Sequence, residues 1–452
     1  MAERIVEIQV SVPLNQFKFV DVSISSFIRL HVKPLPSGGG CKCALDFAVI
    51  IIYYKNMIAA TKIRIYPNTQ QVEKLAKAFG CARWLWNNSL NESQKTYQET
   101  GKGLGHFALN NRLPELKKSV DWLGETHSQV LQAVCLNLSR AFVNFFERRA
   151  AYPTFKSKHG KQTIQYPQGV KIIEGRKLFL PKIGHVKAVV HREITGTIKT
   201  VTLSKTPSGK YFASILTENG LDAPIISFDG KILGIDMGLT HLAITSDGSK
   251  FDNPKHVAKA QKNLKRKQKK LSRKMKGSNS RNKARILVAK AHERVANARK
   301  DYLHKLSRRL VNENQVIAVE DLYVKGMMRN HCLAKSIGDA GWGAFTGMLK
   351  YKTEQAGKGY IEVNRFFPSS KACSCCLHVQ SSMPLTIRSW RCDKCGSIHD
   401  RDINAAQNIR NEAQRMIAAG IAGTANRGTV SQVRGRKPSV LARAIDVRSP
   451  VL

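Results

Sequence analysis

Four cysteines in two close pairs constrain the fold of this chain more than any other feature of its sequence. Cys373 and Cys376 form the first C-x2-C pair, Cys392 and Cys395 form the second, and 15 residues separate the pairs. A tight turn brings two thiolates together in each pair, and four thiolates complete a tetrahedron around Zn2+ without a free position for a substrate. This spacing predicts a structural zinc ribbon and disfavours the alternatives of buried or disulfide-bonded cysteines.

The residues around these cysteines carry positive charge and one aromatic ring. Cys375 is a spare thiol that could replace Cys376 only with a changed turn. Trp390, two residues before a predicted ligand, either contacts nucleic acid or packs in the small core of the ribbon. The basic residues predicted to contact nucleic acid are Lys371, Arg388, Arg391 and Lys394.

The chain as a whole is strongly basic. Its 452 residues include 74 Lys and Arg against 32 Asp and Glu, a formal net charge of +42. The self-repulsion of so much positive charge is offset mainly beside a polyanion, which makes nucleic acid the expected partner. A membrane surface usually attracts one polybasic cluster, whereas the basic residues here run through most of the chain, so no membrane partner is expected.

The sequence also predicts a soluble, cytoplasmic protein of two or three packed units. Its first ten residues lack the basic and apolar regions of a signal peptide, and the apolar run 47–54 is too short to span a bilayer. Five of the ten cysteines lie between Cys373 and Cys395, and the scattered others do not resemble a disulfide framework.

Local patterns predict the elements of the first half. Residues 1–56 alternate weakly and predict short strands around a flexible turn. Residues 57–67 contain a basic strand, and the apolar spacing after Asn68 predicts a helical region that continues to about Tyr152. Short β-type runs divided by Gly, Pro and Ser-Gly turns occupy 155–218 and predict a small antiparallel barrel.

The second half begins with two predicted apolar strands at 231–246. Residues 255–309 contain 21 Lys or Arg against two acids, with apolar residues at helical intervals, and predict two long basic helices hinged at 276–278. The remaining predictions are a strand at 315–319, a helix at about 342–357, a strand at 359–363, a helix at about 403–418 and a disordered tail to Leu452.

Acidic residues stand at the ends of two of these apolar strands. Asp236 interrupts the first strand, where a buried charge is costly without a metal or partner, and Gly234 and Gly238 leave room for close approach. A strand-end Asp before a Gly is also an ordinary turn residue. Glu320 closes the third strand, and Asp321 points to the opposite face, so only one of these two acids can share a site with Asp236.

A third acid, Asp402, begins the helix predicted at 403–418 and could reach a metal from its first turn. It could instead cap that helix, and Asp400 is an alternative ligand. Phosphodiester hydrolysis with divalent ions needs carboxylates, because hard cations take oxygen ligands. Three acids at element ends, a basic surface and a zinc ribbon together favour one metal-dependent active site.

Several motifs in this order resemble the TnpB (OrfB) proteins encoded by bacterial and archaeal insertion sequences, which are relatives of the type V CRISPR effector nucleases. The resemblance covers nearly everything from Met57 to about Ala413. The stretches that carry it are KIRIYPNTQQ, FGCARWLWNNSL, YPTFKSKHGKQTIQYPQ, LGIDMGLTHLAITSDG, VEDLYVKGM, FPSSKACSCC, RSWRCDKCG and HDRDINAAQNI.

The resemblance implies a multidomain α/β protein with an RNase H-like RuvC nuclease core, a helical recognition lobe, a small antiparallel β-barrel wedge and an inserted zinc ribbon. The implied boundaries are 57–67 for the first wedge strand, 68–154 for the helical, helix-turn-helix-like region, 155–228 for the wedge, 229–372 for the nuclease core with its basic helices, 373–396 for the ribbon, 397–413 for the last RuvC motif and 414–452 for the disordered tail.

In activity, the resemblance implies a Mg2+-dependent endonuclease that binds a transposon-derived guide RNA and cuts double-stranded DNA, with base pairing reading the sequence. The positions that match the three catalytic, magnesium-binding acids of the family are Asp236, Glu320 and Asp402. The positions that match its zinc ligands are Cys373, Cys376, Cys392 and Cys395.

Two departures from the family pattern are visible. Leu377 follows Cys376 where the family commonly has Gly, which is expected to adjust the first turn of the ribbon and leave its ligands intact. Residues 1–56 have no counterpart in the family, so Met57 is expected to be the native start and the preceding segment an upstream extension or a mispredicted start.

Two other functions compete with a nuclease. An accessory or regulator that binds nucleic acid but cuts poorly would be indicated by a replaced acid, and all three acids are present. A transposase in the strict sense would break and rejoin DNA ends, and the sequence contains no recognisable catalytic Tyr or strand-transfer module for that reaction.

Overall fold

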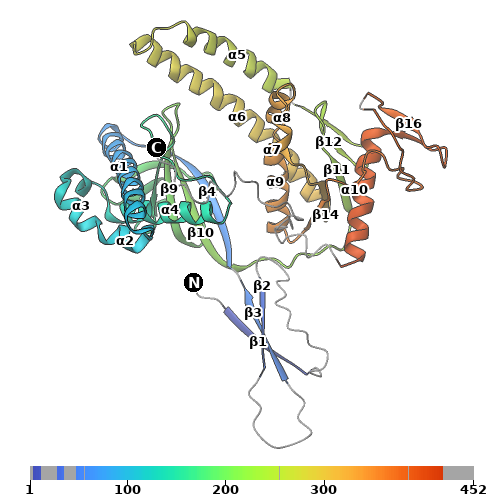
Figure 1. The fold of residues 1–452 in the computed structure, drawn as a ribbon, viewed down its shortest axis with the longest axis horizontal. Coiled ribbons are helices and arrows are strands. Elements are labelled where there is room, and N and C mark those ends of the chain that lie inside the picture. The colour runs from blue at the N-terminus through green and yellow to red at the C-terminus, as the bar shows by residue number, and fades with distance from the viewer. Residues whose placement is uncertain are drawn as a thin grey trace, which may run out of the picture. The chain divides into compact units, whose positions relative to one another are not determined.

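The structure, a computed structural model, describes residues 4–11, 28–34, 47–54, 56–253, 255–384 and 386–420. They belong to two compact units. One unit spans Asn56–Leu221, and the other contains the residues from Asp222 onward together with the strands that precede Lys55. Figure 1 shows the helices and strands of both.

Three N-terminal strands form a sheet of their own. β1 (Arg4–Ser11) and β2 (Ile28–Pro34) each pair antiparallel with β3 (Phe47–Tyr54), which lies in the centre. The weak alternation of residues 1–56 therefore predicted strands correctly. The flexible turn predicted between them lies outside the described residues.

The longest helix of the Asn56–Leu221 unit begins at a capping box. The Asn68 side chain accepts a hydrogen bond from the Gln71 N–H at 2.9 Å, and the Gln71 side chain accepts one from the Asn68 N–H at 3.0 Å. Helix α1 (Thr69–Thr100) follows and ends at Gly101, whose φ of 69° lies in the left-handed region that glycine adopts without strain.

Four shorter helices complete the helical region of this unit. They are α2 (His106–Asn111), α3 (Leu113–Ser119), the 3-10 helix η2 (Asp121–Glu125) and α4 (Ser128–Phe146). The helical region predicted from the sequence is confirmed, but it ends at Phe146 and not at about Tyr152.

Seven strands of the same unit form a curled antiparallel sheet in the order β5-β9-β10-β4-β8-β7-β6. Its strands are β4 (Asn56–Tyr66), β5 (Gln162–Tyr166), β6 (Lys171–Ile173), β7 (Lys177–Leu180), β8 (Gly184–Val189), β9 (Thr197–Lys205) and β10 (Tyr211–Asp222). The predicted β-runs are confirmed. The predicted barrel is corrected to a half-barrel, because β5 and β6 are the two edges and do not pair with each other in the described chain.

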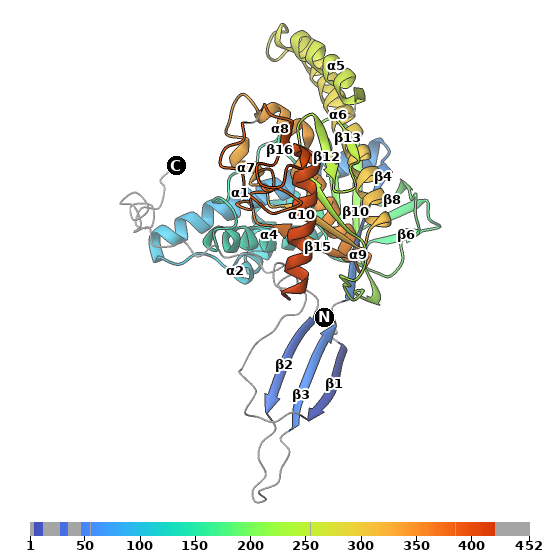
Figure 2. The same cartoon turned by 90° about the vertical axis from the view of Figure 1, so that its right-hand side faces the viewer.

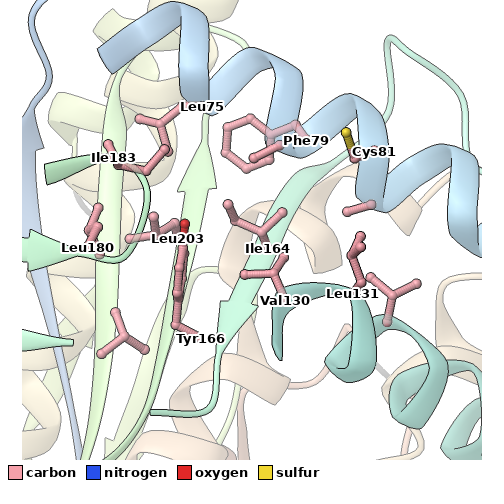
Figure 3. Packing of buried hydrophobic residues seen from close by; sticks show 14 of the residues in the cluster. Leu75, Phe79, Cys81, Val130, Leu131, Ile164, Tyr166, Leu180, Ile183 and Leu203 are labelled. Carbon is pink, nitrogen blue, oxygen red and sulfur yellow. The ribbon is translucent and has the colours of Figure 1, made fainter. Parts of the chain in front are cut away.

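Side chains from α1 and α4 pack against β5, an edge strand of this sheet. Figure 3 shows Leu75 and Phe79 of α1 packed near Ile164 of β5, with Val130 of α4 on the other side. All four are buried, and each such side chain contributes roughly 1.5–3 kcal/mol of transfer free energy. The two helices and the β5 end of the sheet therefore share one hydrophobic core.

The C-terminal unit is built on a mixed five-stranded sheet in the order β13-β12-β11-β14-β15. Its strands are β11 (Ile232–Asp236), β12 (His241–Thr245), β13 (Lys250–Asp252), β14 (Val316–Glu320) and β15 (Gly359–Val363). β11, β14 and β15 run parallel, whereas β12 and β13 are antiparallel to their neighbours. The strands predicted at 231–246, 315–319 and 359–363 are confirmed, and β13 was not predicted.

Helices cover both faces of this sheet. α10 (Arg401–Ala418) packs on one face, where Ile409 and Ala413 contact Val316 and Ala318 of β14. α6 (Asn279–Glu313) and α9 (Trp342–Gln355) pack on the other face, against Ile317 and its neighbours. Figure 2 shows α10 in red in front of the strands. The helices predicted at 342–357 and 403–418 are thus confirmed.

The two predicted basic helices are α5 (Lys255–Ser272) and α6, which lie side by side in Figure 1. The predicted hinge is also confirmed. Gly277 has a φ of 87°, and the Ser278 hydroxyl caps α6 by accepting a hydrogen bond from the Arg281 N–H at 3.1 Å.

Short elements that the sequence did not predict connect the larger ones. They are α7 (Val324–Met327), α8 (Ala334–Ala340), β16 (Ser389–Arg391) and β17 (Ile398–Asp400). The predicted disordered tail at 414–452 is corrected for its first residues, because α10 continues to Ala418. Residues 421–452 lie outside the described part. Within the described ranges, no helix is long and apolar enough to cross a membrane.

Candidate carboxylate site and cysteine cluster

Two of the three predicted acids stand side by side at the ends of parallel strands. Asp236 is the last residue of β11 and Glu320 the last residue of β14, and the register pairs Ile235 with Val319 directly before them. Neighbouring strands lie about 4.8 Å apart. The sheet therefore places the two carboxyl groups next to each other at one edge.

Both acids point to the face that α10 covers. Side chains alternate along a strand, and Gly234 and Ala318, two residues before Asp236 and Glu320, meet α10. Asp321 lies beyond the strand end and forms an ion pair with Arg365. The alternation therefore separates Glu320 from its acidic neighbour, as the sequence predicted.

The third acid comes from the first turn of α10. Asp402 is half-buried, and its Oδ1 accepts a hydrogen bond from Arg388 Nη1 at 3.5 Å. Its negative charge helps to raise the pKa of Asp236. The fold thus brings residues 236, 320 and 402 to one region, although their oxygens do not all approach within 4.8 Å of one another among the described residues.

The structure separates the roles of Asp400 and Asp402. Asp400 is the N-cap of α10, and its carboxylate accepts hydrogen bonds from the N–H groups of Asp402 at 3.0 Å and Ile403 at 3.1 Å. It also pairs with Lys250 of β13 at 2.7 Å. The capping alternative considered for Asp402 is therefore wrong, because Asp400 caps the helix and Asp402 has no capping role.

Burial and mutual repulsion disfavour negative charge at this site. Burial, together with the charges of Glu320 and Asp402, raises the pKa of Asp236 to about 7. Burial and the charge of Asp321 raise the pKa of Glu320 as well. Carboxylates with raised pKa values around one point are the oxygen donors that a hard divalent cation takes, because its charge offsets both costs.

Close helix packing determines where Asp402 lies. A Cβ atom on Gly234 would lie 2.1 Å from the Ala406 carbonyl oxygen and 2.6 Å from the Arg410 nitrogen. Only glycine lets the α10 backbone approach β11 this closely. The room for close approach predicted at Gly234 is therefore occupied by the helix that carries Asp402.

The four paired cysteines form a cluster. The sulfur atoms of Cys373, Cys376, Cys392 and Cys395 all lie within 4.8 Å of one another. Two Sγ–Sγ distances, from Cys373 to Cys395 and from Cys376 to Cys392, are 3.6 Å. This donor set of four sulfurs is suited to a tetrahedral metal ion such as Zn2+.

Trp390 belongs to the core of this cluster. It is buried against Cys373 and Cys392, and its ring lies 4.8 Å from that of His399. The packing interpretation of Trp390 is confirmed. Cys375 is exposed, and it forms a second possible metal-binding group with Cys373 and His399.

His399 was not singled out from the sequence. Its ring is buried, and its Nε2 lies 3.1 Å from Cys373 Sγ. Burial lowers the pKa of the imidazole, which favours the neutral form. The available signal was its position directly before Asp400, between the last cysteine and the acidic motif.

Leu377 adopts a backbone conformation that glycine normally provides. Its φ is 61°, in the left-handed region, and the corresponding Gly396 of the second cysteine turn has a φ of 73°. The predicted adjustment of the first turn is therefore a strained backbone at an exposed side chain, and the sulfur cluster itself is intact.

Three family descriptions match this chain. "Helix-turn-helix domain" matches residues 57–102, "Probable transposase" of the OrfB group matches 227–331, and "Cas12f1-like, TNB domain" matches 342–409. The first of these covers β4, α1 and the start of the loop after it. The second match contains Asp236 and Glu320, and the third contains Asp402 and the four paired cysteines.

Curated relatives match most of the chain. A "Putative RNA-guided DNA endonuclease" of Streptomyces pristinaespiralis is 37% identical over 81% of this chain and 90% of its own length. "Putative RNA-guided DNA endonuclease InsQ" of Escherichia coli is 32% identical over 80% of this chain and 94% of its own length. A solved complex of Cas12f1 with sgRNA and target DNA shares 12% identity with a TM-score of 0.48, over 79% of this chain and 99% of that one.

Proposed function

Because the chain belongs to the TnpB family of insertion-sequence proteins, we propose that it is an RNA-guided DNA endonuclease encoded by a transposable element. Two relatives that carry the name of this activity are covered over nine-tenths or more of their length. The proposed reaction is hydrolysis of phosphodiester bonds in double-stranded DNA.

The observation that carries this proposal is the placement of the acids. Asp236 and Glu320 end adjacent parallel strands and face α10, and Asp402 lies in its first turn. The mixed sheet with helices on both faces supports the RNase H-like, RuvC-type core. We assign Asp236, Glu320 and Asp402 as the catalytic residues.

The donor set of the carboxylate site fits Mg2+. When bound there, Mg2+ would supply Lewis-acid activation of the phosphodiester and of the attacking water. The chain contributes the three carboxylates, which would hold the metal. Gly234 contributes by letting α10 approach β11 closely enough to bring Asp402 to the other acids.

The cysteine cluster is assigned a structural Zn2+. Four thiolates leave no open position for a substrate, so this ion would stabilise the fold of 373–396 and take no part in hydrolysis. Because the binding energy of a structural metal is folding energy, substitution of Cys392 should reduce zinc content and destabilise this segment.

We further assign the partners by charge. The helices α5 and α6 and the net charge of +42 favour binding to a guide RNA and to DNA through phosphate contacts. In this assignment, residues 57–67 and 155–228 form the wedge, 68–154 the recognition lobe, and 229–372 with 397–413 the nuclease core.

The test is cleavage by the full chain purified with RNA transcribed from its native flanking sequence. Bound RNA is sequenced, and cutting of matched duplex DNA with Mg2+ is compared for the parent, Asp236→Ala and Glu320→Gln. Both variants should lose at least about a hundredfold in rate, because each removes a negatively charged carboxylate that would bind the ions.

Asp321→Asn is the matched control, since it changes the acid beside Glu320 that pairs with Arg365. It should retain cutting within about threefold of the parent. RNA binding without cutting by the parent would support an accessory protein in place of a nuclease. Joining of DNA ends would support a transposase.

A further inference from the structure

One buried side chain joins the cysteine cluster to the helix of Asp402. Asn404 lies two residues after Asp402 in α10 and is 1% exposed. Its Nδ2 donates to the Ala372 carbonyl at 2.7 Å, and its Oδ1 accepts from the Ser374 N–H at 2.9 Å. The amide therefore bonds to the backbone on both sides of Cys373.

Neighbouring residues of α10 strengthen this connection. Asn408, one turn later and equally buried, donates to the carbonyls of Ala372 at 2.7 Å and Ser369 at 2.8 Å. Gln407 Oε1 accepts from the Ser374 hydroxyl at 3.0 Å. The first cysteine turn is thus attached to two successive turns of one helix.

The residues directly before Asp402 contact the cysteine cluster at the sulfur atom of Cys373. His399 Nε2 lies 3.1 Å from Cys373 Sγ, and Asp400, the next residue, caps α10. A metal-bound thiolate that accepts a hydrogen bond from a ring N–H is held in one orientation. Asp402 therefore lies between two attachments, at His399 before it and at Asn404 after it.

The opposite side of α10 is held against the sheet. Gly234 of β11 lies against the Ala406 carbonyl, where no side chain would fit. The helix consequently has contacts with the sheet that carries Asp236 and with the turn that carries Cys373. A change in the cysteine turn can reach Asp402 through the hydrogen bonds of the buried Asn404 side chain.

We propose that Asn404 is a positioning residue that couples metal occupancy of the cysteine cluster to the placement of Asp402. The inference rests on the proposed function only in assigning Asp402 to the magnesium-binding acids. Metal at the four cysteines orders residues 372–374, and Asn404 transmits that order to the first turn of α10. By linkage, metal at the carboxylates strengthens metal binding at the cysteines by the same factor.

Hydrogen exchange tests the coupling without reference to activity. The full chain is compared in zinc-loaded and zinc-depleted form, both under reducing conditions. Zinc should slow backbone exchange at residues 401–405 at least about fivefold in the parent, and less than about twofold in Asn404→Ala. Asn411→Ala is the matched control, because the Asn411 side chain bonds to Arg410 of the same helix. It should behave as the parent.

Binding of Mn2+, a spectroscopic probe for the Mg2+ site, provides the second measurement. Zinc loading should tighten Mn2+ binding about tenfold in the parent and leave it unchanged in Asn404→Ala. Equal zinc protection of 401–405 in the parent and Asn404→Ala would overturn the proposal, as would no protection in the parent.

Two further variants keep the outcomes distinct. If Asn404→Ala does not fold, Gln407→Ala decides, since it removes only the half-buried bond to Ser374 and should weaken the zinc protection partially. Unchanged protection in Gln407→Ala would then overturn the coupling. If Asp402→Asn binds Mn2+ as tightly as the parent, the assignment of the acid fails, whereas the exchange result still decides the role of Asn404.

Discussion

At the scale of single residues, the protonation of Asp236 connects the candidate site to stability. Burial and neighbouring acids raise its pKa to about 7 from an ordinary value of 3.8. The folded state therefore binds the proton more tightly than the unfolded state. The stability that this carboxyl contributes is fully present below about pH 4 and is lost as pH rises through 7.

Asp236→Asn should consequently stabilise the protein at high pH when no divalent ion is added. One pKa unit corresponds to about 1.4 kcal/mol, and solvent at this half-buried group reduces the effect, so the expected gain at pH 8 is about 1–3 kcal/mol. At pH 5 the gain should be less than half of that at pH 8, because the loss begins only above about pH 4. Denaturant unfolding at both pH values measures it, and an equal difference at pH 5 and pH 8 would contradict the assignment of burial as its cause.

Leu377 provides a second prediction at this scale. A left-handed residue other than glycine costs roughly 1 kcal/mol, and the exposed Leu377 side chain loses little packing when it is removed. Leu377→Gly should therefore raise the zinc affinity of the cluster by up to about fivefold. Gly396→Ala, at the matching position of the second turn, should lower it. Competition with a chromogenic chelator measures both, and a weaker site in Leu377→Gly would refute the strain argument.

At the scale of elements, the contact between α10 and β11 organises the candidate site. The backbone atoms of Ala406 and Arg410 lie where a Cβ on Gly234 would be, and backbone cannot move aside as a flexible side chain can. This contact could not be predicted from local pattern. The sequence shows a glycine in a strand, but not which backbone approaches it.

Gly234→Ala should therefore destabilise the protein by about 2–4 kcal/mol and weaken divalent-ion binding, since α10 must move away from β11 with Asp402. Gly347→Ala in α9 is the control, because no atom lies within 4 Å of its added Cβ and alanine favours a helix. Thermal unfolding of both variants tests this. A Gly234→Ala protein as stable as the parent would show that the helix can shift freely.

At the scale of the whole molecule, charge favours nucleic-acid binding, whereas the fold assembles the candidate sites. The excess of Lys and Arg is distributed through the chain and requires no particular tertiary structure to favour nucleic acid. The cysteine cluster, by contrast, unites two short turns, and the carboxylate site unites three residues that lie 82 to 166 positions apart in the sequence. Nonlocal strand pairing is what brings Asp236 and Glu320 together.

The sequence by itself determined the elements whose signals are local: the strands from alternation or apolar runs, the basic helices from apolar spacing, the hinge at Gly277 and the paired cysteines. Tertiary structure decided the rest. It formed a half-barrel in which the described edge strands β5 and β6 do not pair with each other, and it gave the capping role at α10 to Asp400 and not to Asp402. It also buried Asn404 between the helix and the cysteine turn. These outcomes depend on which distant surfaces exclude water together, and no periodicity within one segment encodes that choice.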